Sequence, residues 1–400
     1  MHIRINTPSW GWREVAQGAV AIATGGRNHH FRRRLHFELQ REAPGWIPWL
    51  VSSARHAVSL AARMFALEGQ RVAVPGYVCP AVLTGLRAAR VEPVAIDCLP
   101  ASIRFDPEAL AYAIADEGIA GVLAANTYGF DQDFSLLADL GVPVIEDAAY
   151  QSGCTEAGSS RLCGTRGDVG VWSFNFKALT SVGGGVLFVP GETSMDRCGS
   201  ASSSTRETMR FFNYAARSIG RHHIPTSFPG AEAPRPGADS AVRSVLSDIR
   251  EAPMSELQAA VALAQWESRD RLAMIQKRNS SYLADAIARC NALTTLSCQN
   301  GQTTVHLFPV LVRVGSKDAL AAAGAVQRAR AHLYSRGIQT ETPYPMVWKS
   351  TIHLPNSHDL NTRMFLVPCN ASLRNEEMKK ISEALEEASN IIAREFRIEA

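Results

Sequence analysis

The chain has 400 residues, of which 46% are hydrophobic and 20% are charged, and its formal net charge is +3. This length and composition are typical of a globular protein with a sizeable core and more than one domain. Such a small net charge gives no indication of nucleic acid or an anionic membrane as a partner. We interpret the local basic run at 32–34 as a solvated helix face.

The cysteines and the apolar runs indicate a cytoplasmic protein. Eight cysteines are scattered without the spacing of a zinc site or of a disulfide framework. No apolar stretch is long enough to cross a bilayer, and the N-terminal sequence lacks the pattern of a secretion signal. We therefore expect a protein of a reducing compartment, with no metal site and no membrane partner.

Between residues 50 and 190, short apolar runs alternate with helical periodicity. The periodicity predicts helices at 53–67, 80–90, 106–116 and 133–141, and the apolar runs predict strands at 71–77, 92–97, 121–129 and 142–147. Asp106 followed by Pro107 is the pattern of a helix start. Apolar strands that alternate with helices indicate a mostly parallel sheet covered on both faces, with ligands at the carboxyl edge of its strands.

The remainder predicts a surface excursion and a smaller second unit. Residues 191–245 are rich in turn formers, so we expect them to run over the surface near the active site or a subunit interface. Further elements are expected as one long amphipathic helix at 254–290, a strand at 306–314, a helix ending near 334–338 and a final helix at 375–396. We predict an N-terminal arm (1–50), a large domain (51–265) and a small C-terminal α/β domain (266–400).

Polar residues at strand ends, together with one lysine, indicate a covalently bound cofactor. Asp97, Asn126 and Asp147 each follow an apolar run, although aspartates in such places also cap helices. Lys177 lies between an aromatic strand and the glycines 183–185. A lysine that forms a Schiff base needs a partly desolvated site that lowers its pKa. Pyridoxal 5'-phosphate also needs a carboxylate near its ring nitrogen, and Asp147 is the candidate.

A phosphate cradle is predicted at the start of the helix 53–67. Residues 53–56 would offer backbone N–H groups at the positive end of the helix dipole. Glycines 183–185 would let the chain turn tightly and pass close to the cofactor. No glycine-rich loop precedes the helix, so this signal is weak alone.

Three motifs resemble, in order and spacing, the DegT/DnrJ/StrS family of pyridoxal-phosphate enzymes, most of which are sugar aminotransferases. They are PVIEDAAYQSG (143–153), GDVGVWSFNFKALTSVGGGVLF (167–188) and MSELQAAVALAQ (254–265). The resemblance covers nearly everything after about residue 50. It implies the PLP-dependent transferase fold type I, which is α/β, with a mostly parallel sheet flanked by helices and a smaller C-terminal α/β domain.

The resemblance also implies roles for individual residues. Lys177 matches the lysine that bonds to the cofactor and later moves the proton, and Asp147 matches the aspartate at the pyridine nitrogen. Ser173 matches a phosphate-binding serine, and the backbone at Ala54 and Arg55 would bind the same phosphate.

Three further positions match the cofactor's surroundings, and two regions depart from the family pattern. Cys79, or alternatively Tyr77, falls where the family places a residue against the cofactor ring, and Tyr150 replaces a Gln or His near the 3′ oxygen. Gly183 replaces the acid of a G-E-G-G motif, and the segment from Ser173 to Lys177 is one residue shorter than usual.

A second departure concerns an Asn and an Arg with which many members help to build the neighbouring subunit's site. They align here with Glu251 and Pro253, and Arg250 is the candidate substitute. These departures weaken the expectation of an ordinary nucleotide sugar as substrate.

The sequence therefore predicts a cytoplasmic, homodimeric aminotransferase with pyridoxal 5'-phosphate. An amino acid donor, glutamate or glutamine, would supply an amino group to the keto group of a nucleotide-linked sugar by a ping-pong mechanism. Alternatives are another PLP-dependent reaction, amination of a non-sugar intermediate in natural-product biosynthesis, and a non-catalytic regulatory protein of the same fold. Dehydrating members carry a histidine in place of the lysine, so Lys177 argues against that branch.

Overall fold

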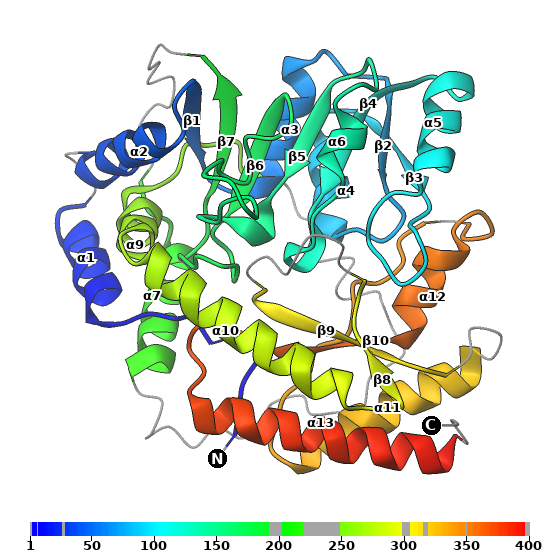
Figure 1. Ribbon diagram of the computed structural model, residues 1–400. Helices are drawn as coiled ribbons and strands as arrows, with labels where there is room; N and C mark the ends of the chain where they lie inside the picture. The colour runs from blue at the N-terminus through cyan, green and yellow to red at the C-terminus, as the bar shows by residue number, and fades with distance from the viewer. Residues whose placement is uncertain are drawn as a thin grey trace.

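The structure is a computed structural model that describes most of the chain in two layers (Figure 1). The described residues are 2–5, 7–25, 29–191, 202–219, 249–297, 305–314, 319–348 and 350–396. None of the helices in these ranges combines the length and the apolar character that crossing a membrane requires.

A seven-stranded sheet forms the upper part of Figure 1, in the order β1-β7-β6-β5-β4-β2-β3. The strands are β1 (Trp46–Val51), β2 (Arg71–Pro75), β3 (Glu92–Ile96), β4 (Ile119–Ala125), β5 (Val144–Asp147), β6 (Val169–Ser173) and β7 (Gly185–Pro190). From β3 to β6 all neighbours are parallel, whereas β7 is antiparallel to both β6 and β1. The predicted mostly parallel sheet is confirmed.

Helices cover both faces of this sheet because its strands are apolar on both sides. The helices α3 (Ala54–Met64) and α4 (Pro80–Ala88) share a core with Leu123 and Ala125 of β4. The helix α5 (Pro107–Asp116) and the short α6 (Phe134–Leu137) share a separate core with Val122 and Ala124. Successive side chains of β4 point into opposite cores. An uninterrupted apolar run is therefore typical of a strand that is buried on both faces.

The predicted start of α5 is confirmed in detail. The side chain of Asp106 accepts hydrogen bonds from the backbone N–H groups of Glu108 (3.0 Å) and Ala109 (3.3 Å). Pro107 occupies the first helical position, where its missing N–H leaves no bond unmade.

The first 50 residues are integrated into the fold rather than forming a simple arm. They form α1 (Trp12–Ala23), α2 (His30–Glu42) and most of the edge strand β1. Ile3 and Ile5 are buried in the core of the smaller sheet, and Ile3 pairs with Ile338. The N-terminal segment therefore connects both layers of the molecule.

The long helix predicted at 254–290 is two helices, α9 (Glu256–Trp266) and α10 (Arg269–Ala288). Every residue of α9 is buried because it packs against α1 and α2 and shares a core with β6 and β7, so the expected amphipathic pattern is wrong for this part. At the break, the guanidinium of Arg269 lies 4.1 Å from the ring centroid of Trp266.

The excursion predicted at 191–245 contains a helix that the sequence reading missed. This helix, α7 (Thr205–Ile219), packs against α1 and α9. Most of the remaining excursion, including His222 and His223, lies outside the described residues.

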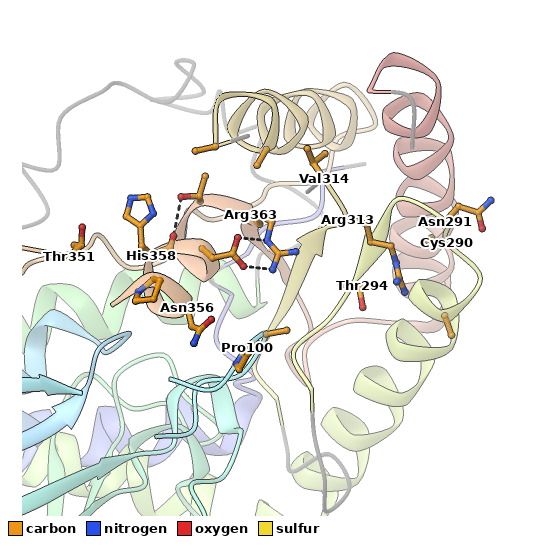
Figure 2. A pocket seen from close by; sticks show the side chains of 17 residues that line it. Pro100, Cys290, Asn291, Thr294, Arg313, Val314, Thr351, Asn356, His358 and Arg363 are labelled. Atoms are coloured by element: carbon orange, nitrogen blue, oxygen red, sulfur yellow. Dashed lines mark hydrogen bonds and ion pairs between the residues drawn. The ribbon is translucent and has the colours of Figure 1, made fainter. Parts of the chain in front are cut away.

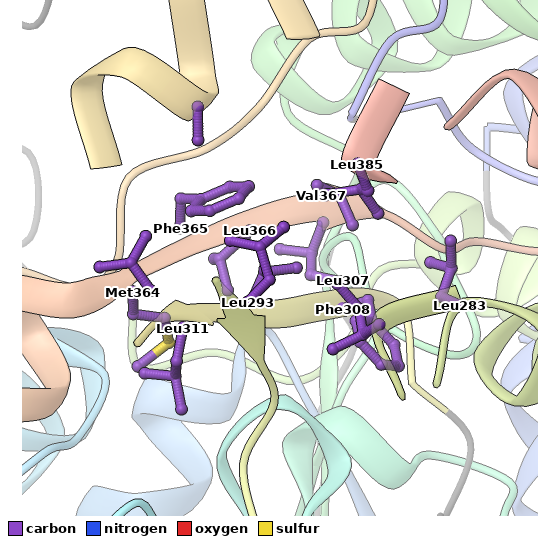
Figure 3. Close-up of a cluster of buried hydrophobic side chains, with 14 of the residues drawn as sticks. Leu283, Leu293, Leu307, Phe308, Leu311, Met364, Phe365, Leu366, Val367 and Leu385 are labelled. Atoms are coloured by element: carbon purple, nitrogen blue, oxygen red, sulfur yellow. The ribbon is translucent and has the colours of Figure 1, made fainter. Parts of the chain in front are cut away.

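A three-stranded antiparallel sheet, β10-β9-β8, forms the lower layer. Its strands are β8 (Leu293–Thr294), β9 (Leu307–Val312) and β10 (Met364–Pro368). The helices α10, α11 (Ala319–Ser335) and α13 (Asn375–Glu395) bury apolar side chains against it, and α12 (Pro355–Arg363) precedes β10 (Figure 3). The predicted strand at 306–314 and the two later helices are confirmed.

Candidate active site

Two cavities in the described part of the chain are considered as candidate sites, and each is large enough for a small molecule. The larger, of about 1160 Å³, lies beside α12 and the small sheet (Figure 2). Its arginines are already engaged, because Arg363 pairs with Asp359 and the Nε atom of Arg313 donates to the carbonyl of Leu293 at 2.9 Å. Groups that are bound to one another in this way have little capacity left for chemistry.

The second cavity, of about 840 Å³, lies at the carboxyl edge of the large sheet. Asp147 ends β5, Ser173 ends β6, and Cys79 follows β2 at the start of α4. All three line this cavity together with Lys177. The carboxyl ends of parallel strands therefore converge on it, as expected for ligand sites in open α/β sheets.

Lys177 lies in the turn between β6 and β7, at a strained point of the backbone. Its neighbour Phe176 has a φ of +51°, a left-handed conformation that non-glycine residues seldom adopt. The Nζ atom of Lys177 lies 3.2 Å from the ring centroid of Tyr150. Burial lowers the pKa of Lys177 to about 8, although Cys79 and Asp147 oppose the shift. The amine therefore loses its proton more readily than an ordinary lysine does, and the neutral amine is the form that a nucleophile requires.

Asp147 is a buried carboxyl group whose pKa moves in the opposite direction. Burial raises the pKa of Asp147 to about 6, while the N–H of Ala149 and the charge of Lys177 partly offset the rise. That N–H donates to the carboxylate at 3.0 Å and fixes its orientation. The adjacent Glu146 is bound instead by Arg166, at 2.6 Å. Of the two neighbouring acids, Asp147 is thus the one that lines the cavity.

The end of the cavity at α3 has the features of an anion site. Ser53 caps α3 by accepting from the N–H of His56 (3.3 Å), and Ala54, Arg55 and Ser173 line the cavity beside it. The turn at 183–184 has φ angles of +127° and +97°, which favour glycine. A Cβ at Gly185 would lie 2.6 Å from the backbone nitrogen of Ala54. The glycines therefore allow β7 to approach the positive end of α3.

Tyr128, Tyr150 and Tyr344 form a tyrosine wall of the cavity, and Tyr77 lies behind it. The hydroxyl groups of Tyr150 and Tyr344 are hydrogen-bonded to each other, and those of Tyr77 and Tyr128 lie 2.6 Å apart. The ring of Tyr128 stacks on that of Tyr344 with centroids 5.5 Å apart. Burial raises the pKa of Tyr150 and Tyr344 well above the usual value, so both phenols stay protonated.

The structure separates the two candidates for the position against the cofactor ring. Cys79 is half-buried and lines the cavity. Tyr77 is only 1% exposed and lies behind the wall, where its hydroxyl group bonds to Tyr128.

Sequence reasoning missed Tyr344, which lines the cavity, and His306, whose pKa responds to the charge of Lys177. Tyr344 comes from the small-sheet side of the chain and is nearly 200 residues away from its partner Tyr150. His306 is buried, and burial together with the charge of Lys177 lowers its pKa to about 3, so it is neutral. The only signal for His306 was its place at the start of a predicted strand.

The strand-end residues Asp97 and Asn126 have different surroundings. Asn126 lines the cavity and donates to Gln151 at 2.9 Å. Asp97 accepts from the N–H groups of Asn356 (3.1 Å) and Ser357 (2.9 Å) and thereby caps α12. Asp97 is therefore a helix cap, which is the alternative that the sequence left open for such aspartates.

Comparisons with known proteins point to one family. The family model of the DegT/DnrJ/EryC1/StrS aminotransferase family matches residues 48–386. EpsN of Bacillus subtilis, provisionally named a pyridoxal phosphate-dependent aminotransferase, is 32% identical over 184 residues, which are 43% of this chain and 46% of EpsN. The L-glutamine:2-deoxy-scyllo-inosose aminotransferase of Streptoalloteichus tenebrarius is 28% identical over 58% of this chain and 52% of its own.

Solved structures extend the likeness to the whole fold. The crystal structure of 3-amino-5-hydroxybenzoic acid synthase matches this chain with a TM-score of 0.72 and 16% sequence identity. The match covers 96% of this chain and 98% of that chain. The chain spans about half the length of the two curated relatives named above.

Proposed function

Because the chain belongs to the DegT/DnrJ/EryC1/StrS aminotransferase family, we propose that it is a pyridoxal 5'-phosphate-dependent aminotransferase. It would move an amino group from glutamate or glutamine to the keto group of a nucleotide-linked sugar by a ping-pong mechanism. The observation that carries this proposal is the sharing of one cavity by Lys177 and Asp147, whose pKa values are shifted toward each other.

The cavity fits this cofactor in three respects. Lys177 offers a partly neutral amine to an aldehyde, and Asp147 offers a carboxylate to a ring nitrogen. The start of α3 with Ser173 offers a seat for a phosphate, which the close approach of Gly185 keeps free of side chains. Cys79 and Tyr150 would then flank the ring, with Tyr150 as a neutral hydrogen-bond partner.

The chemistry of the bound cofactor is an aldehyde that bonds to amines and a ring that takes up electrons. Within this chain, the neutral Nζ of Lys177 would accept a proton from the α carbon of the substrate and deliver it to the aldehyde carbon of the cofactor. The carboxylate of Asp147, held by the N–H of Ala149, would be charged beside a protonated ring nitrogen and would keep the proton on that nitrogen. Buried tyrosines around Lys177 exclude water from this transfer.

The choice of donor and acceptor is supported by the names of relatives. The Streptoalloteichus tenebrarius enzyme uses L-glutamine and a keto derivative of a cyclitol, according to its name. A second candidate acceptor, a non-sugar intermediate, is supported by the name of a curated relative, the 3-amino-5-hydroxybenzoate synthase of Amycolatopsis mediterranei, which is 29% identical over 36% of this chain. A homodimer and a cytoplasmic location complete the proposal, the latter because of the scattered cysteines.

The direct test is a pair of half-reactions with the purified protein. Glutamate or glutamine should remove the visible absorption band of the lysine-bound cofactor, and a keto acceptor from a panel of nucleotide-linked sugars, cyclitols and ring ketones should restore it. Lys177→Ala should lack both the band and turnover. The control Lys277→Ala changes an exposed lysine of α10 and should behave like the wild type. Full transaminase activity of Lys177→Ala would refute the assignment.

A further inference from the structure

The ring of Tyr150 makes a face-on contact with the amine of Lys177. The Nζ atom lies 3.2 Å from the centroid of that ring. Tyr150 lies in the single turn η2 (Ala149–Gln151) after β5, and Lys177 lies in the turn between β6 and β7. An ammonium group over the face of an aromatic ring is attracted by the ring's quadrupole, and more strongly where water is scarce. The orientation of this ring therefore contributes to the proton affinity of the amine.

A hydrogen bond links that ring to the second layer of the molecule. Tyr150 is only 5% exposed, and its hydroxyl group is bonded to the hydroxyl group of Tyr344. Leaving a buried hydroxyl group without a partner is costly. The ring of Tyr150 is therefore kept in the orientation in which this bond is made.

Tyr344 is itself fixed, because each of its polar groups has a partner. Its backbone N–H donates to the hydroxyl group of Tyr77 at 3.0 Å, and its carbonyl accepts from the side-chain amide of Asn361 on α12. Its ring stacks on that of Tyr128 with an interplanar angle of 10°. The hydroxyl group of Tyr344 is thus presented to Tyr150 from a rigid position on the small-sheet side.

Other titratable groups act on the same amine from other elements. Burial lowers the pKa of Lys177 to about 8, and the charges of Cys79 at the start of α4 and of Asp147 at the end of β5 partly oppose this. His306, just before β9, is buried and neutral beside it. The ring of Tyr150 works in the same direction as Cys79 and Asp147, because it too favours the charged amine.

We propose that Tyr344 is a positioning residue, whose hydroxyl bond holds the ring of Tyr150 face-on against the amine of Lys177. This arrangement belongs to the cofactor-free chain, and only its consequence for transamination rests on the proposed function. In that reaction, a residue of the small-sheet layer would adjust the acid–base strength of an amine in the large one. The amine would then have its full proton affinity only while the two layers are packed together.

The test is competitive acetylation of the full-length, cofactor-free protein with acetic anhydride over a range of pH values, followed by peptide mass spectrometry. The rate at Lys177 relative to the exposed Lys277 gives the pKa of Lys177. Tyr344→Phe should lower this pKa by about 0.5, because phenylalanine keeps the volume of the ring but releases Tyr150. Tyr282→Phe, at a 43% exposed position on α10, is the matched control and should leave the pKa unchanged.

A second background separates positioning from packing. Tyr150→Leu removes the ring and should lower the pKa of Lys177 at least as far as Tyr344→Phe does. Adding Tyr344→Phe to Tyr150→Leu should then produce no further change, since the two residues act through one contact. If Tyr150→Leu does not fold, the comparison of Tyr344→Phe with Tyr282→Phe decides the question alone.

Two results would overturn the inference. One is an unchanged pKa of Lys177 in a folded Tyr344→Phe variant, which would leave Tyr344 with a structural role alone. The other is an equal decrease whether or not the ring of Tyr150 is present. The proposed function fails separately, because pyridoxal 5'-phosphate should protect Lys177 of the wild type from acetylation. Absence of that protection would refute the proposed function and leave the labelling result for the cofactor-free protein intact.

Discussion

Lys177 and Asp147 are placed where burial disfavours their charged forms. In water, a lysine and an aspartate would both be ionised at neutral pH. Here the pKa of Lys177 falls from 10.5 to about 8, and that of Asp147 rises from 3.8 to about 6. The cofactor-free protein therefore carries both groups at a cost in stability, which is the usual signature of residues kept for chemistry.

Replacing Lys177 with Met should stabilise the cofactor-free protein at pH 7, by about 1–3 kcal/mol. The folded state binds fewer protons than the unfolded state between pH 8 and 10.5, so wild-type stability rises with pH across that window. The advantage of Lys177→Met should be complete below pH 8 and disappear above 10.5. Urea unfolding at several pH values measures this, and a pH-independent difference would contradict it.

A second prediction at this scale concerns Arg166, whose side chain is 2% exposed and pairs with Glu146 and Asp131. Arg166→Met would leave two carboxylates without their partner and should cost about 3–5 kcal/mol of unfolding free energy. Arg90→Met, which breaks an exposed pair with Glu68, should cost at most about 1 kcal/mol. Equal losses in urea unfolding would show that burial does not set the value of these pairs.

At the scale of elements, local patterns determine which segments become strands and helices. The apolar runs that became β2, β4 and β5 could be predicted because each strand is buried on both faces. The strand β1 escaped prediction because Pro48 interrupts its pattern, and proline is tolerated there since β1 is an edge strand. The break between α9 and α10 depends on which helices surround each half, so periodicity alone could not reveal it.

Asp97 gives a prediction about an element rather than about chemistry. Its carboxylate caps α12 from the end of β3, through the N–H groups of Asn356 and Ser357 and the hydroxyl of Ser357. Asp97→Ala should lower the unfolding free energy by about 1–2 kcal/mol and leave the absorption of the bound cofactor unchanged. Loss of that absorption in a folded variant would mean that Asp97 belongs to the active site.

At the scale of the whole molecule, the site is assembled from segments that are distant in sequence. Lys177 and Asp147 could be recognised because their motifs are local, and the structure places both on one cavity. Tyr344 could not be predicted, since its contacts with Tyr128 and Tyr150 depend on how the two sheets pack. The division into a large domain at 51–265 and a small one at 266–400 remains our proposal.

The contact between the two layers can be tested at Tyr77. Its hydroxyl group bonds to that of Tyr128 and accepts from the N–H of Tyr344 at 3.0 Å. Tyr77→Phe would leave two buried polar groups without this partner and should cost about 1–3 kcal/mol. Tyr112→Phe, at an exposed position on α5, is the control and should have no measurable effect in urea unfolding. A Tyr77 variant as stable as the control would contradict this role.

The most direct test of the whole account is to identify the amine to which the cofactor is bonded. Borohydride reduction of the purified, cofactor-loaded protein makes that bond permanent, and peptide mass spectrometry then locates it. We predict that the pyridoxyl group is found on Lys177 and is absent from the same peptide in Lys177→Ala. A pyridoxyl group on another lysine, or on none, would contradict the account.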